Sequence, residues 1–169
     1  MRKVLFILGQ LSDQDAEWLT ANGRKKVLPP DGVMIREGEP IDSLYVVLEG
    51  LLSVIDRDLG NSEVAQLGCG EVVGEMSFID GRPPSATVRA IERTTALEVP
   101  RRALLHKIET DPAFAARFYR ALAMFLSHRL RTLTHDSPDV DELDPNVLDS
   151  VHLAASRFDR MMKQLMMSA

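Results

Sequence analysis

Glycine is confined to the first half of this chain. All ten glycines lie at or before Gly81, and none follows it. Because glycine adopts the positive φ angles that tight turns require, this distribution indicates turn-rich β structure before Gly81 and helices after it. The sequence therefore predicts an α+β protein, mainly β, in which the strands come first and the long helices last.

Short extended runs fill the glycine-containing half. They are separated by turn sequences such as Pro29-Pro30-Asp31-Gly32 and Gly68-Cys69-Gly70. Eight short strands at close spacing, without long helices between them, are typical of an antiparallel sandwich or barrel. The predicted strands are 25–28, 33–36, 43–50, 51–56, 62–68, 71–74, 85–91 and 95–99.

Helices are predicted on both sides of the strands. Ser12 caps a helix that ends at Asn22-Gly23, where a left-handed residue is expected. A short helix covers 101–111. Asp111-Pro112 then starts a long helix that runs to about residue 134. Its apolar stripe comprises Phe114, Phe118, Leu122, Phe125 or Leu126, Leu130 and Leu133.

The last part of the chain has two segments. Residues 135–146 carry five acidic residues and two prolines but no lysine or arginine, which indicates a solvated linker between a domain at 1–134 and a helix at 147–169. This last helix has heptad-like apolar spacing. It is expected either to dock on its own domain or to form a dimer, and a disordered tail is a third reading. The apolar positions are Leu148, Val151, Ala155, Phe158, Met162 and Leu165.

Composition excludes several functional classes. The net charge of −5 argues against a nucleic-acid or anionic-membrane surface. Cys69 is the only cysteine, so no disulfide framework is expected. The apolar run from Val4 to Leu8 is too short for a signal peptide. No run approaches the ~20 apolar residues that a membrane helix needs. A cytoplasmic location is therefore expected. The four histidines share no metal-ligand spacing, and no nucleophile–base pair is evident, so neither a metal site nor an enzyme is predicted.

One loop carries binding chemistry. After Gly74-Glu75, the run from Met76 to Ile79 can form a single helical turn whose free amide groups make a cradle for an anion. The Glu75 carboxylate can accept hydrogen bonds from sugar hydroxyls. Two hydroxyls, those of Ser85 and Thr87, flank the Ala86 amide on the returning strand. Together these groups suit a phosphorylated sugar ring.

These residues resemble the phosphate-binding cassette of cyclic nucleotide-binding domains, which occur in catabolite-activator-type regulators, kinase regulatory subunits and nucleotide-gated channels. The resemblance covers about residues 5 to 133. It rests on Gly74-Glu75-Met76 and Ser85-Ala86-Thr87-Val88 in the cassette, and on Gly32, Ile35, Glu37-Gly38-Glu39, Asp42, Leu44-Tyr45, Val47, Gly50, Leu52 and Val54 before it.

The resemblance implies a jelly-roll β-domain flanked by an N-terminal helix and C-terminal helices. It also implies a cyclic nucleotide ligand, cAMP or cGMP, in the 74–87 cassette. Glu75 would bind the ribose 2′-hydroxyl, and the amides after it, at Met76 and Ser77, would meet the phosphate together with that of Ala86. Ser85 and Thr87 would lie near the phosphate and base. The 111–134 helix would cover the base and pair between subunits.

One departure concerns the phosphate. Where the family has an arginine, this chain has Pro84, which offers neither a charge nor an amide proton. Losing one charge-assisted bond costs about 1.5–3 kcal/mol, roughly ten- to a hundredfold in affinity. Arg82 is the nearest substitute in the loop, with Arg89 a weaker one, and Glu75 has the alternative of pairing with Arg82 or capping the turn.

Three functions remain open at this point. The first is a stand-alone sensor without a helix-turn-helix, in which ligand binding moves the 111–134 helix and alters a homodimer formed through 111–134 and 147–167. The second is a degenerate fold that has lost the nucleotide and serves as a protein-interaction or dimerisation module. The third is a pocket for a different anionic metabolite. Pro84 favours the second and third, whereas the intact cassette residues favour the first.

Overall fold

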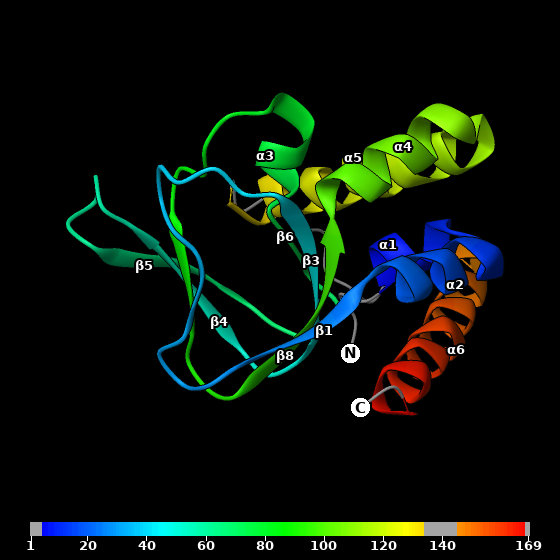
Figure 1. Ribbon diagram of the computed structural model, residues 1–169, viewed down its shortest axis with the longest axis horizontal. Coiled ribbons are helices and arrows are strands. Elements are labelled where there is room, and N and C mark those ends of the chain that lie inside the picture. Colours follow the sequence, from blue (N-terminus) through cyan, green and yellow to red (C-terminus); the bar gives the residue numbers. More distant parts are fainter. Residues whose placement is uncertain (1–4, 134–144, 168–169) are drawn as a thin grey trace. The chain divides into compact units, whose positions relative to one another are not determined.

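The computed structural model describes residues 5–133 and 145–167 of the chain (Figure 1). The chain divides into two compact units. The β-unit comprises residues 19–105, and the helical unit comprises the described parts of 2–18 and 106–169. The element order is α1 (Leu5–Gln10), α2 (Asp13–Asn22), β1 (Arg24–Leu28), β2 (Val33–Ile35), β3 (Ser43–Glu49), β4 (Leu52–Asp56), β5 (Ser62–Leu67), β6 (Val72–Val73), α3 (Glu75–Asp80), β7 (Thr87–Ala90), β8 (Thr94–Pro100), α4 (Arg101–Thr110), α5 (Pro112–Leu133) and α6 (Pro145–Met167).

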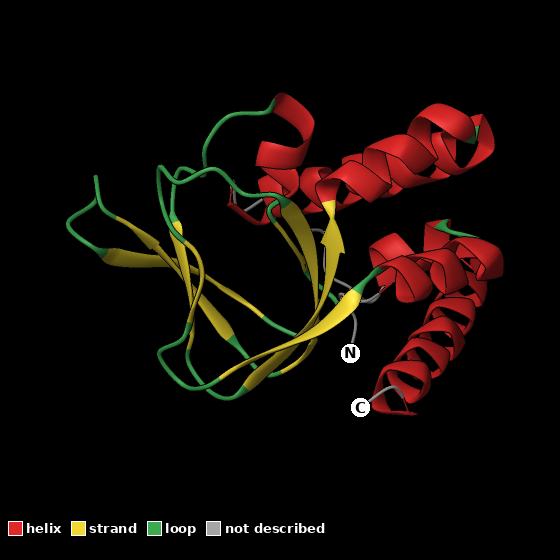
Figure 2. Cartoon of the chain, in the orientation of Figure 1, coloured by secondary structure: helices red, strands yellow, loops and turns green. Residues whose placement is uncertain are grey.

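The β-unit contains two four-stranded sheets (Figure 2). One has the strand order β1-β8-β3-β6 and the other β2-β7-β4-β5, and every pairing is antiparallel. All eight predicted strands are present, with ends that differ by one or two residues from the sequence-based bounds. The prediction of an eight-stranded antiparallel β-domain with flanking helices is confirmed.

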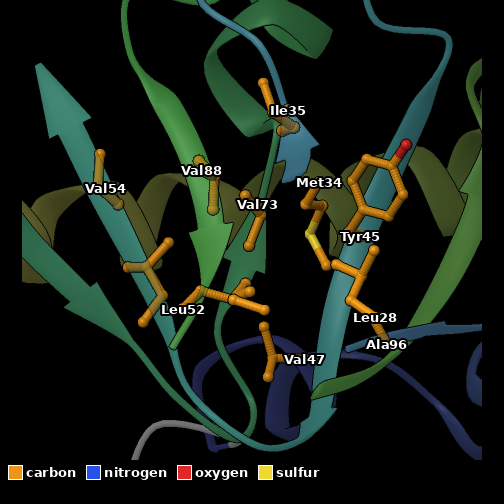
Figure 3. Close-up of a cluster of buried hydrophobic side chains, with 12 residues drawn as sticks. Leu28, Met34, Ile35, Tyr45, Val47, Leu52, Val54, Val73, Val88 and Ala96 are labelled. Carbon is orange, nitrogen blue, oxygen red and sulfur yellow. The ribbon is translucent and has the colours of Figure 1, made fainter. Parts of the chain in front are cut away.

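Alternate side chains of both sheets point into one apolar core (Figure 3). Val47 and Leu52 are fully enclosed there, and the ring of Tyr45 lies beside Met34 with its hydroxyl directed away from the aliphatic cluster. The cluster comprises Leu28, Met34, Ile35, Tyr45, Val47, Leu52, Val54, Leu67, Val73, Val88, Ala90 and Ala96. Burial of these side chains is the main stabilising contribution in this unit.

The end of α2 corrects one expectation. The helix stops at Asn22 as predicted, but neither Asn22 nor Gly23 adopts a positive φ. Gly23 is instead required by space, because a Cβ there would approach the Leu97 Cδ1 at 2.5 Å and the Leu19 carbonyl oxygen at 2.8 Å. The glycine therefore marks a close approach to β8 rather than a left-handed cap.

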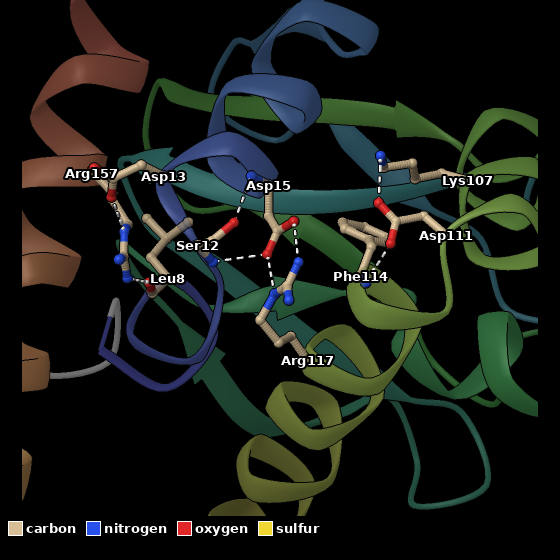
Figure 4. A network of polar contacts seen from close by, with 9 residues as sticks. All are labelled: Leu8, Ser12, Asp13, Asp15, Lys107, Asp111, Phe114, Arg117 and Arg157. Carbon is tan, nitrogen blue, oxygen red and sulfur yellow. Dashed lines mark hydrogen bonds and ion pairs between the residues drawn. The ribbon is translucent and has the colours of Figure 1, made fainter.

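Two predicted N-caps in the helical unit are confirmed (Figure 4). The Asp15 amide donates to Ser12 Oγ at 3.2 Å, and the Ser12 amide donates to Asp15 Oδ2 at 2.7 Å, so the two residues cap α2 reciprocally. The Phe114 amide donates to Asp111 Oδ1 at 2.9 Å, ahead of Pro112 at the first position of α5. Short-range sequence signals located both helix starts.

The core of the helical unit joins α1, α5 and α6. Phe114 and Phe118 of α5 are buried and stacked, with ring centroids 5.5 Å apart, and Trp18 packs against Phe114. Leu122 and Phe125 continue the predicted stripe, but Leu130 is exposed. α1 was missed by the sequence reasoning, which found only a short apolar run there.

Of the predicted apolar positions of α6 whose burial is described, Leu165 is confirmed, but the rest of the buried face differs. The buried positions are Ala154, Arg157, Met161 and Leu165, whereas Ala155 is exposed and Phe158 and Met162 are only half-buried. α6 contacts α1, and a disordered tail is therefore the wrong reading for 145–167. Of the predicted linker 135–146, residues 135–144 lie outside the described residues, as do the predicted positions beyond 167. α6 begins at Pro145, two residues before the predicted start at 147.

Candidate ligand-binding site

The loop singled out in the sequence folds as a short helix between two glycines. α3 (Glu75–Asp80) begins after Gly74, which has φ 90°, and ends at Gly81, which has φ 71° and donates its amide to the Ser77 carbonyl oxygen at 3.0 Å. A Cβ on Gly74 would lie 2.8 Å from Ile41 Cδ1. The positive φ favours glycine at position 74, and any larger residue would also have to displace the end of the Ile41 side chain.

Burial divides the cassette side chains. Glu75 is only 3% exposed, and Ser77 and Phe78 are buried beside it. Met76 points outward and is exposed. Among the predicted residues 74–77, the side chains of Glu75 and Ser77 therefore face the interior, as does the backbone of Gly74. Met76 can contribute only its amide to a ligand.

The returning strand is tied to the turn at Glu37-Gly38. The Gly38 amide donates to the Pro84 carbonyl oxygen at 2.9 Å, and the Glu37 amide donates to Thr87 Oγ1 at 3.2 Å. Ala86 is half-buried against the apolar core, and Ser85 is exposed. The predicted residues Ser85, Ala86 and Thr87 are thus held at the start of β7, and the Thr87 hydroxyl is already engaged with the backbone.

The cations expected to replace the missing arginine lie elsewhere. Arg82 has a side chain that is 85% exposed, and its Nε lies 3.9 Å from Asp80 Oδ2. It therefore pairs with Asp80 rather than with Glu75. Arg89 pairs with Asp31 at 3.7 Å on the surface. Both candidate replacements for the arginine that Pro84 lacks are thus paired with surface aspartates.

Glu37 is a residue to which the sequence reasoning gave no role. Its Oε2 is buried and has no hydrogen-bond partner within the described part of the chain. The sequence signal was its place in Glu37-Gly38-Glu39, one of the stretches that carry the resemblance, and this turn holds Pro84.

Other classes of site receive no support in the described ranges. Residues 5–133 and 145–167 contain no group of three or more His, Cys, Asp or Glu side chains arranged to hold a metal ion. Within the same ranges, no helix has both the length and the apolar character needed to cross a bilayer. Cys69 is half-buried, its Sγ lies 3.2 Å from the Leu48 carbonyl oxygen, and burial raises the pKa of its thiol.

Comparison with known proteins agrees with this geometry. The family model for the cyclic nucleotide-binding domain matches residues 25–111, just over half of the chain. A crystal structure of a cyclic nucleotide-binding domain from Methylobacillus flagellatus is 27% identical, with a TM-score of 0.70, and the match covers 82% of this chain and 85% of that one. The chain belongs to the cyclic nucleotide-binding domain family, and its eight strands form the family's jelly-roll fold.

Curated relatives place the same domain in different proteins. An NTE family protein of Mycobacterium tuberculosis is 25% identical over 134 residues, 79% of this chain and 23% of the relative. A cyclic nucleotide-gated potassium channel of Mesorhizobium japonicum is 37% identical over 76 residues, 45% of this chain and 20% of the channel. The chain thus spans less than a quarter of the length of either relative. Cyclic nucleotide-binding domains are generally regulatory rather than catalytic.

Proposed function

We propose that this chain is a ligand-responsive regulatory module that binds a cyclic nucleotide, cAMP or cGMP, in the 74–87 cassette. The observation that carries the proposal is the geometry of Gly74-Glu75. A left-handed glycine introduces a short helix, and the carboxylate that follows it is buried at 3% exposure. This places a carboxylate at the start of the cassette helix, the type of acceptor that a ribose hydroxyl requires.

In this proposal Glu75 accepts the ribose 2′-hydroxyl, and backbone amides of Met76, Ser77 and Ala86 bind the cyclic phosphate. Ser85 supplies a further hydroxyl, and Arg82 can move from Asp80 to the phosphate because its side chain is exposed. The ligand then shifts α5, which transmits the signal. The module is not an enzyme in this proposal, and a cytoplasmic location and the lack of nucleic-acid binding remain predictions.

Calorimetric titration with cAMP and cGMP tests the proposal. We expect the nucleotide-stripped natural chain to bind one of them in the micromolar range, and Glu75→Ala to abolish saturable binding. Pro84→Arg should tighten binding roughly ten- to a hundredfold by restoring one charge-assisted bond. Glu92→Ala, at an exposed glutamate in the β7–β8 turn, is the matched control and should bind like the natural chain.

The second candidate is an interaction module that has lost the nucleotide. It is favoured by the closed turn in which the Gly38 amide bonds Pro84, and by the unpartnered Glu37 carboxylate nearby. If this candidate is correct, the calorimetric titration should show no binding heat for the natural chain and saturable binding for Pro84→Arg. No binding by either chain would contradict the first proposal and leave the cassette without a nucleotide role.

We also propose that the module is a homodimer, with α5 and α6 at the interface. Three large side chains of α5, Tyr119, Met124 and Leu130, are exposed, which supports a role of this helix in association. α6 has already buried one of its faces within its own unit, so it can contribute only the remaining ones.

A further inference from the structure

The β-unit holds a pocket that contains no cassette residue. Its volume is about 300 Å³, which is within the usual range for small-molecule sites. It lies where β1 and β3 start and β2 and β8 end. The lining comprises Arg24, Val33, Met34, Ile35, Arg36, Glu39, Pro40, Ile41, Asp42, Ser43, Tyr45 and Glu98.

The floor of the pocket is a row of residues across one sheet. Arg24 of β1 stands opposite Glu98 of β8, and Glu98 stands opposite Tyr45 of β3. Tyr45 belongs to the apolar core, so the same face carries Glu98 toward the interior, where it is 6% exposed. A carboxylate has thus been placed at an inward position where an apolar residue is expected.

This carboxylate is fixed by its neighbours. Glu98 accepts hydrogen bonds from Arg24 Nε at 2.8 Å and from the Tyr45 hydroxyl at 3.2 Å, and Lys26 Nζ lies 3.8 Å away. Burial, and then the charge of Glu98, raises the pKa of Tyr45 to about 12, so the hydroxyl remains protonated and donates. The floor is therefore a satisfied and rigid polar network.

The rim of the pocket differs from the floor because its charges are unpaired. Within the described residues, the side chains of Arg36, Glu39 and Asp42 have no ion pair or hydrogen bond. Two free carboxylates and a free guanidinium line this pocket, and its more accessible apolar residues are Val33, Pro40 and Ile41.

We propose that this pocket is a second ligand site, specific for a small zwitterion of the class of free α-amino acids with an apolar side chain. The ammonium group would bind Glu39 and Asp42. The carboxylate would bind Arg36, and the outer nitrogens of Arg24 could assist, because only its Nε is used by Glu98. The apolar side chain would pack on Val33, Pro40 and Ile41. A phosphorylated ligand fits poorly, because the rim carboxylates would repel it.

Heteronuclear NMR of the full chain tests the site with L-leucine, L-methionine and L-phenylalanine as probes. We expect saturable shifts of amide signals in 36–43 and at Tyr45. For the best-binding probe, the analogues that lack the ammonium or the carboxylate, such as 4-methylpentanoate and 3-methylbutylamine for leucine, should bind about tenfold more weakly or worse. No saturable shift with any probe, or binding of both analogues as tight as that of the parent amino acid, would overturn the proposal.

Variants separate the site from general charge effects. Arg36→Gln and Asp42→Asn should each weaken binding about tenfold. Arg57→Gln and Asp58→Asn, at exposed positions in the β4–β5 turn, are the matched controls and should bind like the natural chain. Unchanged binding by Arg36→Gln and Asp42→Asn would contradict the assignment. Titration of the same sample with cAMP reports on 74–87, so the cassette proposal and this one can fail separately.

Discussion

Arg117 of α5 makes a bidentate ion pair with Asp15 of α2, a residue 102 positions earlier in the chain (Figure 4). Nε lies 2.6 Å from Oδ2 and Nη2 lies 2.9 Å from Oδ1, and the Asp15 side chain is almost completely buried. The parallel geometry of two charge-assisted bonds makes this one of the stronger polar contacts available to a protein.

We expect Arg117→Ala to lower the free energy of unfolding by about 2–3 kcal/mol, because it leaves a buried carboxylate without its main partner. Urea denaturation measures this change. Arg120→Ala is the matched control, since Arg120 is exposed on the same helix, and it should change stability by less than about 0.5 kcal/mol. A loss for Arg117→Ala no larger than for the control would contradict the structural role of the pair.

Stability should also depend on pH through Asp15. Burial raises the pKa of its carboxyl, but the bonds from Arg117 and Ser12 outweigh this effect and hold the pKa below its usual value. A carboxyl with a lower pKa in the folded chain stabilises it above the unfolded value, about 3.9, and loses this contribution as the pH falls through the folded pKa. The difference in stability between the natural chain and Asp15→Asn should therefore be constant above about pH 5 and shrink below about pH 4. A difference that grows on acidification would contradict this assignment.

Gly74→Ala should destabilise the β-unit more than Gly60→Ala. Both glycines have positive φ, 90° and 72°, so both substitutions introduce backbone strain of about 1 kcal/mol or more. A Cβ at Gly60 meets no atom within 4 Å, whereas a Cβ at Gly74 approaches Ile41 Cδ1 at 2.8 Å. The excess loss in Gly74→Ala, measured by thermal or urea unfolding, reports this close approach. Equal losses would show that Ile41 moves aside without cost.

Thr87→Val should cost about 1 kcal/mol, because the half-buried Glu37 amide loses its acceptor. Thr87→Ser keeps the hydroxyl and is the matched control, with a smaller loss. Hydrogen exchange of the Glu37 amide gives a local readout, and it should accelerate in Thr87→Val alone. Equal exchange rates in the two variants would indicate that the hydrogen bond does not protect this turn.

Leu130→Glu tests the proposed homodimer. Leu130 is 63% exposed on α5. If this face of α5 forms the dimer interface, Leu130→Glu would bury an unpaired charge there and weaken the dimer. Light scattering after size exclusion should show a dimer for the natural chain and a monomer for Leu130→Glu. Leu59→Glu, at a leucine of 61% exposure in the β4–β5 turn, is the control and should remain dimeric. A monomeric natural chain, or a dimer unaffected by Leu130→Glu, would exclude α5 from association.

Local chemistry made much of the cassette predictable. Glycines on both sides of Glu75-Met76-Ser77-Phe78-Ile79-Asp80 indicated a short turn of helix, and α3 occupies this segment between Gly74 and Gly81. What the sequence could not show is how each side chain is used. Thr87 was expected to face a ligand, but its hydroxyl accepts the Glu37 amide, a residue 50 positions away. Such a partner is chosen by strand pairing, which no local pattern encodes.

The sequence by itself determined the eight strands and the helix starts at Ser12 and Asp111, because turn residues, alternation and caps act within a few positions of the chain. Only the tertiary structure decided which face of α6 is buried. Heptad spacing favoured Ala155, Phe158, Met162 and Leu165. Of these only Leu165 is buried, together with Ala154, Arg157 and Met161. The reason is electrostatic: Arg157 Nε lies 2.6 Å from Asp13 Oδ1, and its Nη1 donates to the Leu8 carbonyl oxygen at 2.7 Å (Figure 4). One residue of offset turns a helix by about 100°, so a long-range ion pair can select between neighbouring faces that periodicity alone leaves nearly equivalent.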